Sequence, residues 1–151
     1  MSKDKGKKLR FGVISASAMA VLHMEGIIRN ENTELAAICD LYEERAKKAA
    51  DKFGMENYYT DYKEVIKRDD IDAIVIVTPD SLHPEHAVAA LEAGKHVLCE
   101  KPMALSRAEC IEMIKASEKT GKKLMIGQIC RYTPGFRLAK KLIDEGRIGE
   151  L

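Results

Sequence analysis

Short apolar runs alternate with longer segments of helical spacing along nearly the whole chain. The run at 73–77, Ala-Ile-Val-Ile-Val, is typical of a strand that helices cover on both faces. Strands that alternate with helices predict βαβ units, so we expect an α/β protein with a doubly wound parallel sheet. The strands are expected at 9–14, 34–39, 73–77, 97–100 and 123–127, with a weaker sixth candidate at 58–60.

Helix signals fill the segments between these runs. Apolar residues recur there at helical spacing, and the segments stop before glycines that can end a helix, as Gly54 does. Ser106 and Glu109 have the spacing of a capping box, in which each side chain bonds the backbone of the other residue. Helices are therefore expected at 43–53, 84–93 and 106–120.

Composition narrows the possible functions. Of the 151 residues, 25 are Lys or Arg and 24 are Asp or Glu, which gives a formal net charge of +1. This balance offers no basic field for a phosphate backbone or anionic lipid, so nucleic acid and membranes are poor candidate partners. The four cysteines match no zinc or disulfide pattern, and the apolar stretch after the charged leader at 1–8 is too short for a secretory signal. We expect a soluble cytoplasmic protein without a metal site.

A turn rich in small residues follows the first strand, where the sequence reads Gly-Val-Ile-Ser-Ala-Ser-Ala-Met-Ala from Gly12. A strand that turns into a helix in this way can present backbone N–H groups and a helix N-terminus to a pyrophosphate. Two serines and an alanine stand where the dinucleotide fingerprint has its three glycines. The residues expected to bind the dinucleotide are Ser15, Ser17, Ala18 and Met19. The alternative is a plain strand-to-helix connection.

Asp40 strengthens the dinucleotide interpretation. It ends the second strand, 20 residues beyond Ala20, where a carboxylate can accept hydrogen bonds from the adenosine ribose hydroxyls and repel a 2′-phosphate. We therefore expect NAD rather than NADP. The alternative role for Asp40 is an N-cap of the following helix, and S-adenosylmethionine enzymes share both features.

Three further motifs lie near the ends of the later strands. They are Thr78-Pro79 with His83, Gly94-Lys95-His96-Val97 and Glu100-Lys101-Pro102, and the chain closes with Gly-Arg-Ile-Gly-Glu-Leu. With these motifs, residues 9–151 resemble the glucose-fructose oxidoreductase, inositol dehydrogenase and rhizopine-catabolism (Gfo/Idh/MocA) family, and the serine-containing loop resembles a minority form of the family's phosphate loop. The resemblance implies a Rossmann-type nucleotide-binding domain at 9–128.

By this resemblance Thr78, Pro79 and His83 would line the nicotinamide side of the cleft, and Glu100 and Lys101 would meet cofactor and substrate. Lys101 is the expected catalytic residue, because an ammonium group there can hydrogen-bond a substrate hydroxyl and stabilise developing negative charge. The alternatives are a solvated surface lysine for Lys101 and a helix-start residue for His83. The remaining histidines are expected to be structural: His23, His86 and His96.

Members of the family resemble one another in having a second, mixed α/β domain with a substrate wall, an oligomer interface and a catalytic histidine. Residues 129–151 are expected to be the crossover toward such a domain, so the 151-residue chain alone is expected to be inactive. The resemblance implies hydride transfer between NAD and a sugar, cyclitol or related polyol by a protein that is a homo-oligomer when complete. The alternatives are a non-catalytic dinucleotide-binding regulator and an NAD-assisted glycosidase of the same family.

Overall fold

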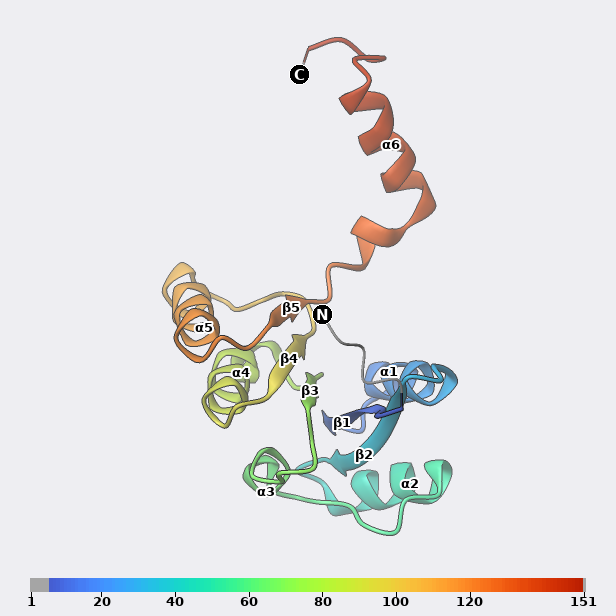
Figure 1. Cartoon of the computed structure of the whole chain (residues 1–151), viewed down its shortest axis with the longest axis vertical. Helices are drawn as coiled ribbons and strands as arrows, with labels where there is room; N and C mark the ends of the chain where they lie inside the picture. The colour runs from blue at the N-terminus through green and yellow to red at the C-terminus, as the bar shows by residue number, and fades with distance from the viewer. Residues whose placement is uncertain (1–5, 151) are drawn as a thin grey trace.

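A computed structural model describes residues 6–150, so residues 1–5 of the predicted leader lie outside the described part. The strands are β1 (Leu9–Ile14), β2 (Thr33–Cys39), β3 (Ala73–Ile76), β4 (His96–Cys99) and β5 (Leu124–Ile126). The helices are α1 (Ala18–Arg29), α2 (Glu43–Phe53), α3 (Tyr62–Ile66), α4 (His83–Glu92), α5 (Arg107–Thr120) and α6 (Pro134–Asp144). Two short 3₁₀ helices, η1 (Asp80–Leu82) and η2 (Ile129–Tyr132), complete the element order (Figure 1).

The described strands form one parallel sheet of five strands in the order β2-β1-β3-β4-β5. The predicted doubly wound α/β fold is therefore confirmed. The sixth strand candidate at 58–60 is wrong, because Tyr59 makes only an isolated bridge with Cys39. Asp61 then caps α3 through the amide of Lys63, so the chain turns away from the sheet after this single rung.

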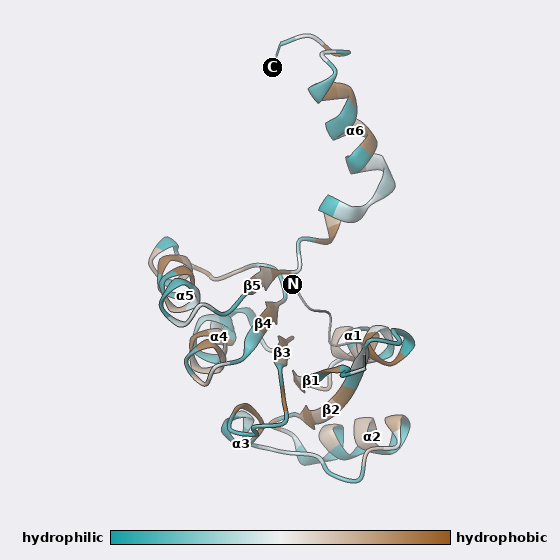
Figure 2. Ribbon diagram, viewed as in Figure 1, coloured by the Kyte–Doolittle hydropathy of each residue, from teal (hydrophilic) through white to brown (hydrophobic). Residues whose placement is uncertain are grey.

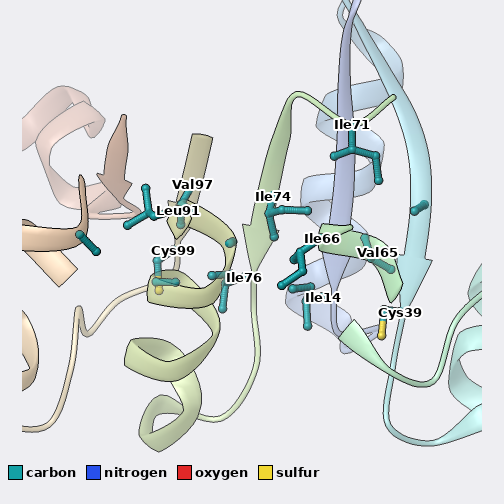
Figure 3. Close-up of a cluster of buried hydrophobic side chains, with 14 of the residues drawn as sticks. Ile14, Cys39, Val65, Ile66, Ile71, Ile74, Ile76, Leu91, Val97 and Cys99 are labelled. Atoms are coloured by element: carbon teal, nitrogen blue, oxygen red, sulfur yellow. The ribbon is translucent and has the colours of Figure 1, made fainter. Parts of the chain in front are cut away.

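Strand residues alternate between two cores. Ile14, Ile74 and Ile76 belong to the core beneath α3, α4 and α5, whereas Val13 and Val75 belong to the core beneath α1 and α2. Figure 1 shows the first helix group to the left of the sheet and the second to the right, and Figure 3 shows the side chains of the first core. Apolar colour is concentrated on the strands in Figure 2, as expected for strands buried on both faces.

The predicted helix ends follow from local hydrogen bonding. The capping box is confirmed, since the Ser106 side chain accepts from the Glu109 amide and the Glu109 carboxylate accepts from the Ser106 amide. Gly54 ends α2 at a φ of 67°, a left-handed conformation that a residue with a Cβ adopts only with strain. The Ser106 capping box therefore sets the start of α5, and Gly54 sets the end of α2.

Charged side chains connect the strands at their amino-terminal edge. Arg10 of β1 pairs with Glu34 of β2 at 2.6 Å and with Asp70 at 2.9 Å, and Asp70 also pairs with Arg68 at 2.7 Å. These arginines hold the pKa of Asp70 well below its ordinary range, with the hydrogen bond from Arg68 as the largest cause. The buried ammonium of Lys95, just before β4, donates to the carbonyl oxygens of two residues in this region, Arg68 and Ile71.

The helix α6 stands away from the sheet and follows η2 (Figure 1). One side of it is apolar and the other polar in Figure 2, and Phe136 and Leu138 are exposed. Two exposed ion pairs run along it, Lys140 with Asp144 and Lys141 with Glu145. These pairs each contribute only a few tenths of a kcal/mol to a helix.

The packing between β1 and α3 generates a stability prediction. A Cβ at Gly12 would lie 2.7 Å from Cγ1 of Val65 and 3.0 Å from Cδ1 of Ile74, so Gly12→Ala should destabilise the fold by about 1–3 kcal/mol. The matched control is Gly26→Ala in α1, where nothing lies within 4 Å of the added atom. There we expect a gain of about 0.5–1 kcal/mol, because alanine loses less backbone entropy than glycine in a helix. Urea unfolding measures both changes, and equal effects would contradict this account of the packing.

Candidate functional site

The candidate site lies at the edge of the sheet where the strands end. Because the strands are parallel, their carboxyl ends share one edge, and Ser15, Asp40, Thr78 and Glu100 directly or closely follow four of them. The chain leaves β1 toward β2 on one side and continues from β3 to β5 on the other, so the order reverses next to β1. Open α/β sheets bind their ligands at such a switch point.

The loop after β1 is held in shape by its two serines. Ser15 has a φ of 109°, an uncommon conformation for a residue with a side chain, and its Oγ accepts from the amide of Ser17 at 3.1 Å. Ser17 is the N-cap of α1 and accepts from the amide of Ala20. The amides of Ala18 and Met19 belong to the first turn of α1, whose N–H groups have no partner within a helix and suit an anion.

Asp40 connects the ends of β1 and β2. Asp40 as a residue is 6% exposed, and its Oδ2 accepts from the amide of Ala16 at 2.7 Å and its Oδ1 from the amide of Tyr42 at 2.9 Å. The N-cap of α2 is Tyr42, and Asp40 lies two residues before it, so Asp40 is not that helix's N-cap. Each carboxylate oxygen can accept more than one hydrogen bond, which leaves acceptor capacity for ribose hydroxyls.

A pocket of about 700 Å³ lies beside the loop after β1. Three of its lining side chains are basic and come from one face of α2: Arg45, Lys48 and Lys52. Lys52 is also paired with Glu25 at 2.9 Å, and the Arg45 guanidinium lies 4.6 Å from the centroid of the Tyr42 ring. The sequence reasoning missed these cations, although their spacing places them on one side of the predicted helix. Their positive potential suits a phosphate-bearing ligand.

The loop after β3 is organised by two histidines. His83 is 1% exposed, with Nδ1 at 2.7 Å from the carbonyl oxygen of Pro102 and Nε2 at 3.0 Å from that of Thr78. The Thr78 hydroxyl lies 3.1 Å from Nδ1 of His86, and burial lowers the pKa of His86 below its ordinary value. His83 thus connects two loops of the site from inside the fold, while Pro79 is exposed at the surface. A role for Thr78, Pro79 or His83 toward nicotinamide stays a prediction.

The loop after β4 places Glu100 and Lys101 differently. The Glu100 side chain is 10% exposed, with Oε1 at 2.8 Å from Nε2 of His23 and Oε2 accepting from the Lys101 amide at 3.0 Å. Lys101 itself is exposed. The sequence reasoning assigned His23 a structural role only and missed its contact with Glu100. No spacing signal could have found this contact, because the two residues are 77 positions apart.

Two further observations concern metal ligands and membrane-spanning helices. Within residues 6–150, no cluster of three or more His, Cys, Asp or Glu side chains is placed to hold a metal ion. None of the helices in this part is both long and apolar enough to cross a membrane.

The family model described as "Oxidoreductase family, NAD-binding Rossmann fold" (GFO_IDH_MocA) matches residues 9–128. The chain belongs to the Gfo/Idh/MocA family. The resemblance found in the sequence is thereby confirmed, and with it a nucleotide-binding fold of the class that the site geometry indicates. In this family the domain present here is the one that binds NAD.

Similar proteins in the Gfo/Idh/MocA family include inositol 2-dehydrogenase of Salmonella typhimurium, 35% identical over 145 residues that cover 94% of this chain. The crystal structure of myo-inositol 2-dehydrogenase from Lactobacillus plantarum aligns with a TM-score of 0.88 at 35% identity and covers 96% of the chain. The WlbA dehydrogenase from Bordetella pertussis, solved in complex with NADH and UDP-GlcNAcA, aligns with a TM-score of 0.90 at 31% identity over 95% of the chain. The chain spans only 43%, 43% and 44% of these three proteins.

Two buried cysteines, Cys39 and Cys99, lie directly before Asp40 and Glu100 in the sequence, and their burial leads to a prediction about thiol reactivity. Burial is the main cause that raises the pKa of both Cys39 and Cys99 to about 12, with a smaller contribution from neighbouring carboxylates. At pH 8 iodoacetamide should therefore modify exposed Cys130 readily and leave Cys39 and Cys99 unmodified until the protein is unfolded, because only the thiolate reacts. Peptide mass spectrometry reports each cysteine separately. Modification of Cys39 or Cys99 as fast as Cys130 in the folded protein would contradict the buried placement.

Proposed function

We propose that this chain is the cofactor-binding part of an NAD-dependent oxidoreductase that transfers hydride between nicotinamide and a sugar, cyclitol or related polyol. The observation that carries the proposal is the joint placement of the α1 N-terminus and the Asp40 carboxylate at the switch point of the sheet. The printed names of the similar proteins, inositol dehydrogenases among them, support a polyol substrate. The family's turnover belongs to proteins more than twice this length, so we expect none from residues 1–151 alone.

The residues present fit an NAD molecule. The amides of Ala18 and Met19 would hold the pyrophosphate, with Arg45 and Lys48 adding positive charge beside it. The free acceptor capacity of Asp40 would bind the adenosine ribose hydroxyls, and its charge would oppose a 2′-phosphate. Bound there, the cofactor would supply a hydride acceptor in its oxidised form and a hydride donor in its reduced form.

Lys101 is the residue we propose for the substrate oxygen. The Glu100 carboxylate accepts a hydrogen bond from the backbone amide of Lys101. Lys101 is exposed at the end of β4, next to the end of β3 that carries Thr78. An ammonium group there would donate a hydrogen bond to the substrate hydroxyl and stabilise negative charge on the oxygen as hydride leaves the carbon. Thr78, Pro79 and the loops connected by His83 would border the nicotinamide. A homo-oligomeric state and a cytoplasmic location of the complete protein remain part of the proposal.

The assignment of Asp40 predicts cofactor preference. The chain should bind NAD at least about tenfold more tightly than NADP, because the buried Asp40 carboxylate would face the extra phosphate. Asp40→Asn should narrow that ratio by about threefold or more, since the amide keeps the shape and one of the two acceptor atoms but removes the charge. Calorimetric titration of both cofactors gives the ratio, which a general loss of stability would not change. Equal affinities in the parent chain, or an unchanged ratio in the variant, would refute this role.

The assignment of Lys101 predicts a kinetic effect in the complete enzyme. Lys101→Met should lower kcat by about 10² and change NAD affinity less than about threefold, as for other preorganised electrostatic groups. The control is Lys119→Met, because the ammonium of Lys119 contacts Glu92 on the surface of α4 at 3.5 Å. Steady-state kinetics beside a cofactor titration separates the two parameters. A kcat within about threefold of the parent enzyme would show that Lys101 is not catalytic.

A further inference from the structure

The Glu100 carboxylate is a tightly constrained charged group at the site. It is nearly buried, and each oxygen has a separate partner, the His23 ring on one side and the Lys101 amide on the other. A Cβ at Gly127, just after β5, would lie 3.2 Å from Oε1 and 3.4 Å from Oε2, so the end of β5 closes a third side. A carboxylate in such surroundings keeps the orientation that its hydrogen bonds give it.

His23 belongs to the helix that begins at the phosphate loop. It lies in the second turn of α1, and its neighbours Ala20 and Met24 are fully buried against the sheet, so the helix holds the ring in a fixed position. Nε2 faces a carboxylate oxygen and therefore carries the hydrogen of this bond. One hydrogen bond thus joins α1 to the loop that carries Lys101.

We propose that His23 is a positioning residue that fixes Glu100, and through it the backbone of Lys101, relative to the phosphate-binding turn of α1. The inference rests on the proposed function, since it assumes a dinucleotide across the switch point. It predicts an effect on one half of that ligand. Asp40 and the adenosine half lie toward β2, whereas Glu100 and Lys101 lie on the other side of β1, beyond β3. Loss of the His23 bond should therefore weaken the hold on the nicotinamide half alone.

The test compares two ligands that differ by nicotinamide. NADH and ADP-ribose are titrated calorimetrically into the 151-residue chain and into His23→Leu and His23→Gln. Leucine removes the donor, so Glu100 and the Lys101 backbone lose one hydrogen bond to a charged group that holds them in place, and the affinity for NADH relative to ADP-ribose should fall about tenfold. Glutamine places an amide N–H near the position of Nε2, so that variant should keep the ratio within about threefold. Equal weakening of both ligands, or an equal loss in the glutamine variant, would overturn the proposal.

A second measurement needs no ligand. Amide hydrogen exchange at Lys101 should quicken about tenfold in His23→Leu and stay near the parent rate in His23→Gln, because the Glu100 carboxylate holds that amide. The matched control is His96→Leu, since the His96 ring accepts from the Lys123 amide at the opposite end of β4. It should alter neither the ligand ratio nor exchange at Lys101. Unchanged exchange in His23→Leu overturns the positioning role, whereas a parent chain that binds neither ligand overturns the proposed function instead.

Discussion

The carboxyl ends of the described strands all lie at one edge of the sheet, because the strands are parallel. Strands β1 to β3 bury apolar side chains in two cores, so a polar group along their buried stretches would carry a large desolvation cost. At the carboxyl edge, the first positions where a polar side chain avoids this desolvation cost are those just after the strands. Ser15, Asp40, Thr78 and Glu100 occupy such positions, and this shared edge makes a ligand site out of residues that are far apart in sequence.

Two buried carboxylates do most of the organising at that edge. Asp40 bonds amides in the loops after β1 and β2, and Glu100 bonds the Lys101 amide and the His23 ring. Hydrogen bonds to an ionised group are roughly twice as strong as neutral ones, and burial protects them from competition by water. The loops are therefore held in place before a ligand arrives, which lowers the ordering cost of binding.

The sequence predicted those parts of the molecule that local pattern controls. The buried run at 73–77 and the capping box at Ser106 are local signals, and both elements lie where they are expected. The strand predicted at 58–60 failed because a short apolar stretch does not show whether a neighbour offers more than one rung. Motif spacing placed Lys101 and Asp40 at strand ends, but no pattern could show that His23 reaches Glu100 or that His83 is enclosed by backbone carbonyls. Such contacts depend on how α1 and α4 dock onto the sheet, which only the three-dimensional packing determines.

The ion-pair network around Arg10, Glu34 and Asp70 lies at the edge of the sheet opposite to the site. Its members and Lys95 connect the starts of four strands, while the candidate ligand contacts all lie at the other ends. Natural selection can therefore change stability through one edge of the sheet and ligand binding through the other. Substitutions that raise heat tolerance can accumulate at the charged edge while the loops at the other edge diverge toward new ligands. An engineer can use the same separation by stabilising the amino-terminal edge first, so that later destabilising changes near Lys101 are tolerated.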